Sequence, residues 1–160
     1  MRYLGALFVV ASSWIAGGIA AKVVKEYPDS LCSLCRLAEY TLRRICRERA
    51  PLSAIFRNFD DPFLEKKGFL AILRSEGDIR ELWRCAIEKL PLSEEIRLEC
   101  LSFGGDLGVL PLYEQQKRLE SLRDALLKER DSALKSLPAK QKSVRAVAAL
   151  AGALAAIVLI

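Results

Sequence analysis

The chain has 160 residues, of which 52% are hydrophobic and 28% are charged, and its formal net charge at pH 7 is +5. This length suits one domain. Basic and acidic residues alternate at helical spacing instead of gathering a basic patch among aromatic residues, which argues against nucleic-acid binding. The chain contains no histidine, the commonest general base, so no catalytic residues, no small-molecule substrate and no enzymatic activity are predicted.

Both ends of the chain are apolar. Residues 3–21 are 19 uncharged residues, and a helix of that length covers about 28 Å, close to the thickness of the hydrocarbon layer. Residues 139–160 are predicted to form a second transmembrane helix that starts near Pro138, with its basic side chains reaching the interface. A cleaved signal peptide is the alternative for the N-terminal segment, although its apolar run exceeds the usual core of roughly 7–15 residues.

Charge predicts the orientation of these two spans. All 20 acidic residues and 24 of the 25 basic ones lie between Lys22 and Arg145. The positive-inside rule therefore places residues 22–138 in the cytoplasm and both ends across the membrane. The predicted localisation is the cell membrane.

Small residues recur every fourth position in each predicted span. This spacing permits close helix contact in lipid, and it also arises by chance in alanine-rich helices. The candidate membrane-helix packing positions are Ser13, Gly17, Ala21, Ala148, Gly152 and Ala156.

Apolar residues in the middle of the chain recur every three or four positions, which predicts helices. Asp60 and Asp61 before Pro62 are expected to supply an N-cap and a first turn, and Ser93 is expected to cap a later helix. The predicted fold is all-α, a compact bundle of about six helices over residues 22–138 with a transmembrane helix at each end. The predicted bundle helices are residues 31–46, 52–56, 62–70, 79–87, 93–103 and 112–137, with Gly68 as a weak point in the third.

Cys32 and Cys35 form a CxxC motif among five cysteines. No further thiols stand at metal-ligand spacing, and no histidine is present to complete a zinc site. Both positions also fall on the apolar face of a predicted helix, where cysteine packs as a small hydrophobic residue. We therefore predict no metal and no cofactor, and keep an exported CxxC thiol protein as an alternative.

The stretch "FGGDLGVLP" at residues 103–111 is predicted to be a turn. It lacks the Lys and the Ser or Thr of a phosphate-binding loop. The turn and the start of the next helix are the candidate surface for docking a partner, and the alternative is a purely architectural role. The candidate residues are Phe103, Gly104, Leu107, Gly108, Gln115, Gln116 and Lys117.

Several motifs in chain order resemble the stage III sporulation protein AB family of endospore-forming bacteria. They are "LGALFVVASSWIAGGIAAKVV", "APLSAIF", "ELWRCAIEKL", "FGGDLG" followed by "EQQKRLESL", and the apolar C-terminal "ALAGALAAIVLI". The chain has "RERAPL" where the family usually carries a Tyr-Gly pair before this helix start, and Pro138 interrupts a helix that is continuous in relatives.

The resemblance implies a bundle similar to the F-domain of type II secretion and type IV pilus platform proteins. It also implies a non-enzymatic component of the channel between mother cell and forespore, in the mother-cell membrane around the forespore. Its expected partners are the secretion-type ATPase, stage III sporulation protein AA, and other proteins of the channel complex. A general secretion or pilus platform subunit remains the alternative.

Overall fold

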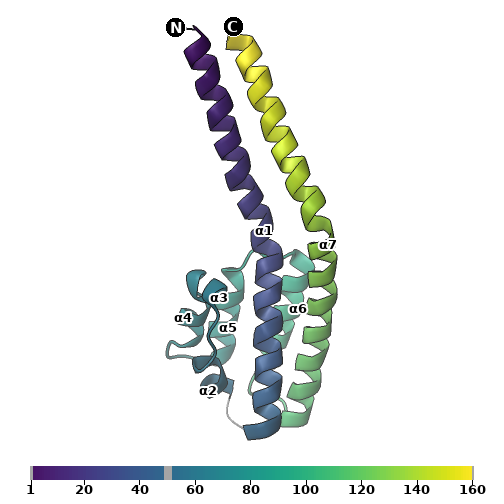
Figure 1. Cartoon of the computed structure of the whole chain (residues 1–160). Helices are drawn as coiled ribbons and strands as arrows, with labels where there is room; N and C mark the ends of the chain where they lie inside the picture. The colour runs from purple at the N-terminus through teal and green to yellow at the C-terminus, as the bar shows by residue number, and fades with distance from the viewer. Residues whose placement is uncertain (1, 49–51, 160) are drawn as a thin grey trace. The chain divides into compact units, whose positions relative to one another are not determined.

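The computed structural model describes residues 2–48 and 52–159, with side chains from residue 18 onward except at 19, 21, 46–48, 53, 112, 152, 153 and 155–159. The described ranges form seven helices and no strand, which confirms the predicted all-α class. The helices are α1 (Arg2–Glu48), α2 (Leu52–Arg57), α3 (Pro62–Lys66), α4 (Phe69–Leu73), α5 (Ile79–Glu88), α6 (Glu94–Gly105) and α7 (Leu112–Leu159) (Figure 1).

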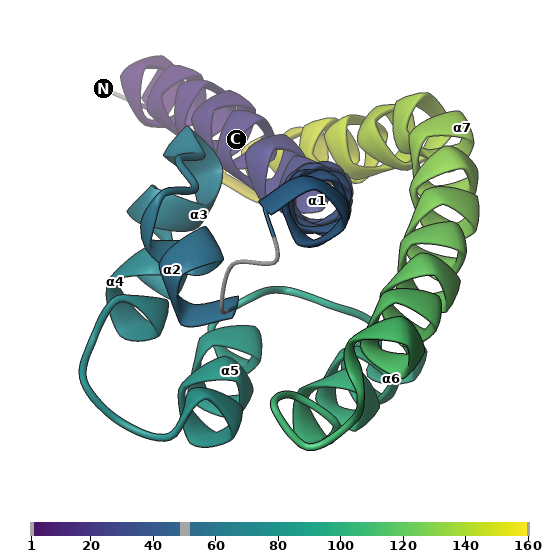
Figure 2. The same cartoon turned by 90° about the horizontal axis from the view of Figure 1, so that it is seen from below.

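The chain divides into two compact units. We call Tyr27–Asp131 the core segment, and we call Met1–Glu26 with Ser132–Ile160 the end segments. In the core segment, α4 packs against α2, α3 and α5, and α5 packs against α6. Figure 2 shows the chain passing from α1 through these short helices and returning with α6 and α7.

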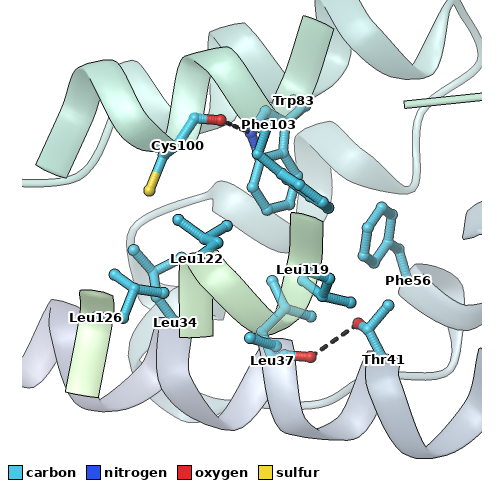
Figure 3. A pocket seen from close by; sticks show the side chains of 11 residues that line it. Leu34, Leu37, Thr41, Phe56, Trp83, Cys100, Phe103, Leu119, Leu122 and Leu126 are labelled. Carbon is cyan, nitrogen blue, oxygen red and sulfur yellow. Dashed lines mark hydrogen bonds between the residues drawn. The ribbon is translucent and has the colours of Figure 1, made fainter. Parts of the chain in front are cut away.

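Trp83 on α5 lies at the centre of the packed core. Its ring centroid is 5.7 Å from that of Phe56, 5.8 Å from that of Phe69 and 5.5 Å from that of Phe103. The indole Nε1 donates a hydrogen bond of 2.8 Å to the carbonyl of Cys100, so the buried N–H is satisfied. One side chain thus joins α2, α4, α5 and α6. Figure 3 shows it with Phe56, Phe103 and the Cys100 carbonyl.

Asp61 is the N-cap of α3, as the sequence predicts. Its Oδ1 accepts hydrogen bonds from the backbone N–H groups of Phe63 and Leu64, at 3.0 and 3.1 Å. Its Oδ2 lies 2.7 Å from the guanidinium of Arg36 on α1, and the carboxylate is only 2% exposed. The same side chain therefore starts one helix and joins it to another.

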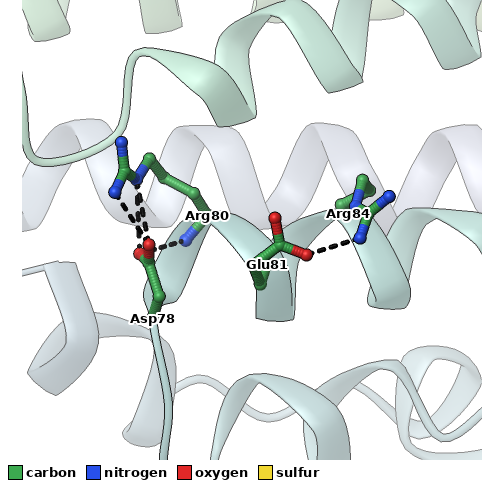
Figure 4. Close-up of polar contacts among 4 residues, drawn as sticks. All are labelled: Asp78, Arg80, Glu81 and Arg84. Atoms are coloured by element: carbon green, nitrogen blue, oxygen red, sulfur yellow. Dashed lines mark hydrogen bonds and ion pairs between the residues drawn. The ribbon is translucent and has the colours of Figure 1, made fainter.

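Asp78 caps α5 in a similar but solvent-exposed arrangement. Its carboxylate accepts from the backbone N–H of Arg80 at 3.1 Å and from the guanidinium of the same residue at 2.8 Å (Figure 4). These bonds lower the pKa of the Asp78 carboxyl. Glu81 and Arg84 form an ion pair one turn further along the exposed face of this helix.

Two local predictions were wrong. The predicted helix 62–70 is two helices, because Gly68, its expected weak point, adopts a left-handed conformation with φ 74° and separates them. Ser93 stands at the N-cap position of α6 but makes no side-chain capping bond. Its hydroxyl instead lies 3.1 Å from that of Tyr27, which donates a 2.6 Å hydrogen bond to Glu129 and so joins α1 to α7.

Pro138 does not begin a new helix, contrary to the sequence prediction. It lies inside the continuous α7, and Pro28 lies inside α1 in the same way. Proline removes one backbone hydrogen bond from a helix and costs about 3 kcal/mol in an interior position. Pro138 is exposed, so the Leu134 carbonyl that loses its partner can be hydrated.

The end segments are helical over their described residues. No helix among the described residues has both the length and the apolarity needed to cross a bilayer. Of the candidate membrane-helix packing positions, Ala148 is partly exposed. The side chains of the others lie outside the described residues, namely Ser13, Gly17, Ala21, Gly152 and Ala156.

The candidate docking surface at the α6–α7 turn

α6 continues into the stretch that was predicted to be a turn and ends at Gly105. Gly104 lies within this helix and allows it to pack directly against Trp83. A Cβ atom at Gly104 would lie 2.3 Å from Cδ1 of Trp83. No side chain other than hydrogen fits there. The glycine pair is thus part of a helix, and the true turn begins at Asp106.

The turn is held by buried apolar residues and by its backbone. Phe103 and Leu107 are 7% and 2% exposed, so they anchor both sides of the turn in the core. Gly108 has φ 75°, a left-handed conformation that favours glycine and lets the chain reverse toward α7. The buried candidates Phe103, Gly104 and Leu107 therefore support the turn from inside.

Polar side chains hold the start of α7 to the turn. The Gln115 side-chain amide donates a 2.9 Å hydrogen bond to the carbonyl of Leu110, and Arg118 Nε lies 3.0 Å from Asp106 Oδ2. Gln116 donates a 3.0 Å hydrogen bond to Glu120 on the next turn of the same helix. Gln115 thus has a structural use within the turn that the sequence did not reveal.

The outer surface of this region is apolar. Val109 is 65% exposed and Tyr113 is 76% exposed, the most exposed large hydrophobic side chains among those described in the core segment. Gly108, Pro111 and Lys117 are exposed beside them. Sequence reasoning missed Val109 and Tyr113, although the apolar run "VLPLY" immediately after the glycines could have indicated them. We call Val109, Tyr113 and Lys117 the turn surface.

The cavity enclosed by the described core residues is too small for a ligand. A cavity of about 10 Å³ lies between Trp83, Phe103, Leu119 and Thr41, whose hydroxyl donates to the Leu37 carbonyl (Figure 3). A single water needs about 10–15 Å³ by this measure, so no organic ligand fits. Among the described side chains, no three His, Cys, Asp or Glu residues gather as metal ligands would.

A hollow open to solvent lies between α1 and α7 of the core segment. Its volume is about 350 Å³, and its walls are Glu39, Leu42 and Arg43 on one helix and Arg123 and Leu127 on the other. The sequence did not indicate it, because its two walls lie far apart in the chain.

Two of the described thiols, Cys35 and Cys100, are core residues, whereas Cys32 is half-buried and Cys85 is exposed. Cys35 is 2% exposed and Cys100 is fully buried. Burial raises the pKa of the Cys35 thiol to about 11 and that of the Cys100 thiol to about 12. A redox-active CxxC needs a lowered pKa instead, since the thiolate is the nucleophile. Cys35, one half of the CxxC motif, thus lacks the lowered thiol pKa of a redox nucleophile.

Comparison with known protein families matches residues 2–160 to stage III sporulation protein AB. The chain belongs to this family. No curated protein and no solved structure shows a significant match to the chain. The family membership confirms the resemblance predicted from the motif order and assigns the protein to stage III of sporulation. In this chain the motif "FGGDLG" lets α6 pack on Trp83 and then reverses the chain direction.

Proposed function

We propose that this stage III sporulation protein is a membrane-anchored, non-enzymatic platform of the channel complex between mother cell and forespore, and that it docks the secretion-type ATPase through the turn surface. The family match over residues 2–160 supports the place in sporulation. The charge-free run at residues 3–21 and the apolar end after Arg145 support two membrane helices, with the core segment in the cytoplasm.

The observation that carries the docking proposal is the exposure of Val109 and Tyr113 on an otherwise well-packed core segment. Tyrosine is among the residues that dominate binding energy at protein interfaces, because it buries a large area with little loss of rotamer freedom. Lys117 adds a positive charge beside them that suits an acidic rim on the partner. The turn beneath is held from inside, so the surface is presented in a fixed geometry.

Substitution of Tyr113 tests this proposal. Tyr113→Ala in the full-length protein is expected to weaken co-purification with the ATPase by roughly tenfold or more, as loss of an interface hot spot does. Leu98→Ala is the matched control, since Leu98 is 58% exposed on α6 and lies outside the turn surface. The control is expected to retain binding.

Equal ATPase binding by the native protein, Tyr113→Ala and Val109→Ser would contradict the docking proposal. Gln115→Ala serves as a control for the stability of the turn. It removes the hydrogen bond to the Leu110 carbonyl and is expected to lower the free energy of unfolding while the turn surface itself is unchanged. Membrane anchoring is tested separately by alkaline carbonate extraction of membranes. Release of the full-length chain into the supernatant would overturn the anchored platform.

A further inference from the structure

The net positive charge of the protein lies entirely in the end segments. They hold seven of the 25 basic residues and one of the 20 acidic residues. The core segment is left with 18 basic and 19 acidic residues and is nearly neutral. A large anionic partner is therefore attracted to the ends of the chain and gains little from the bundle.

The basic side chains of the end segments face solvent. Six of them are described and all six are exposed, namely Lys22, Lys25, Lys135, Lys140, Lys142 and Arg145. Four lie on α7 between Lys135 and Arg145, which is about 15 Å of helix. Exposed ammonium and guanidinium groups are charge-assisted donors to phosphate oxygens.

An apolar stripe follows this basic stretch on α7. Val147, Leu150 and Leu154 are 64%, 65% and 64% exposed. Their spacing of three and four residues places them on one face of the helix. Lys140 precedes Val147 by seven residues, so it lies on the same face about 10 Å away along the axis. This face thus presents a cation followed by a row of exposed aliphatic side chains.

We propose that this face of α7 binds an anionic phospholipid. The headgroup phosphate contacts Lys140 and the neighbouring basic side chains, and an acyl chain lies along Val147, Leu150 and Leu154. This inference rests on the membrane attachment proposed above and adds the class of lipid. A zwitterionic lipid gains less from the basic stretch, since its choline or ethanolamine group cancels part of the attraction. A nucleic acid gains nothing from the aliphatic stripe.

Lipid selectivity of the reconstituted full-length protein tests the proposal. The protein is placed in phosphatidylcholine bilayers with 30 mol% phosphatidylglycerol, and spin-labelled forms of both lipids report their relative association constant. The native chain is expected to prefer phosphatidylglycerol several-fold, since each basic side chain at an anionic surface contributes about fivefold in affinity. Raising the salt concentration from 0.1 to 1 M is expected to weaken the preference.

Two charge-matched variants locate the preference. Lys140→Gln with Lys142→Gln and Arg145→Gln is expected to bring the relative association constant close to one. Arg57→Gln with Lys66→Gln and Lys89→Gln removes three exposed charges from the core segment and is expected to leave the preference intact.

Equal association of both lipids with the native chain would overturn the inference, and so would an equal loss of preference in the two variants. Tight binding of a short single-stranded RNA that disappears with the Lys140 variant would assign the surface to nucleic acid instead. These outcomes are distinct from a failure of membrane attachment, because a chain released by carbonate never reaches the lipid measurement. If the triple variant does not insert, the salt dependence of the native chain still tests whether the lipid preference is electrostatic.

Discussion

The core segment and the end segments are both helical, but they differ in the burial of their apolar residues and in their net charge. Apart from Ala133, all described buried hydrophobic residues lie in the core segment, where charges of both signs nearly balance. The end segments expose Val23, Leu150 and Leu154 and carry an excess of positive charge. Helix formation therefore does not distinguish the two regions, because both are helical. The difference lies in the apolar side chains, which other helices cover in the core segment and which stay exposed in the end segments, where we propose that lipid covers them.

The largest expected effect on the stability of the core segment comes from adding one methyl group at Gly104. Gly104→Ala is expected to lower the free energy of unfolding by about 1–3 kcal/mol, because the new Cβ overlaps the Trp83 indole and the core must shift. Denaturant unfolding of the full-length protein, followed by tryptophan fluorescence, measures the change.

The neighbouring glycine supplies the control for this substitution. A Cβ at Gly105 meets no atom within 4 Å. Gly105→Ala is therefore expected to be neutral or to stabilise the protein by up to about 1 kcal/mol, through the better helix propensity of alanine. Similar destabilisation by both variants would mean that the close approach of α6 to Trp83 is not what the core depends on.

A smaller effect is expected at Asp61, where the core segment uses a charge to organise helices. Asp61→Ala should cost about 1–2 kcal/mol, because the first turn of α3 loses its cap. Asp61→Asn keeps the capping oxygen and loses only the pair with Arg36, whose side chain is 60% exposed. Its cost is expected to stay below about 1 kcal/mol. Equal unfolding midpoints for the two variants would show that the ion pair, and not the cap, matters.

A loss of stability in alkali sharpens the comparison further, because all five cysteines belong to the core segment. The ordinary thiol pKa of 9.0 is raised by burial to about 11 at Cys35 and about 12 at Cys100. Above pH 9 the unfolded chain releases these protons while the folded protein retains them. Stability is therefore fully present below pH 9 and falls as the pH rises through about 11 and toward 12, which denaturant unfolding at a series of pH values measures.

Native-state alkylation tests the burial of these two thiols without unfolding the protein. At pH 8.5 the exposed Cys85 is expected to react with iodoacetamide while Cys35 and Cys100 stay unmodified, as mass spectrometry of peptides would show. Alkylation of Cys35 at the rate of Cys85 would mean that the face of α1 around it opens readily.

Much of the fold could be read from the sequence because it depends on local chemistry. The three- and four-residue periodicity gave the helices, and Asp61 before Pro62 gave a cap, since a carboxylate there reaches the free N–H groups of the first turn. Prediction failed where a distant residue decides the local conformation. Ser93 does not cap α6 because Tyr27 takes up its hydroxyl, and α6 includes the glycine pair because Trp83 packs against it.

For the candidate site, the sequence located the turn and the tertiary structure sorted its residues. Glycines, aspartate and proline in close succession were enough to indicate a chain reversal between two helices. Which of the neighbouring side chains point inward depends on what the rest of the chain places behind them. Phe103 and Leu107 face Trp83 and the core, while Val109 and Tyr113 meet no such surface and are left exposed.

By itself the sequence therefore determined the helical class, the family and the segregation of charge toward the ends, since these are properties of residues and their spacing. Only the packing of α5 against α6 decided which residues of the turn remain open to a partner.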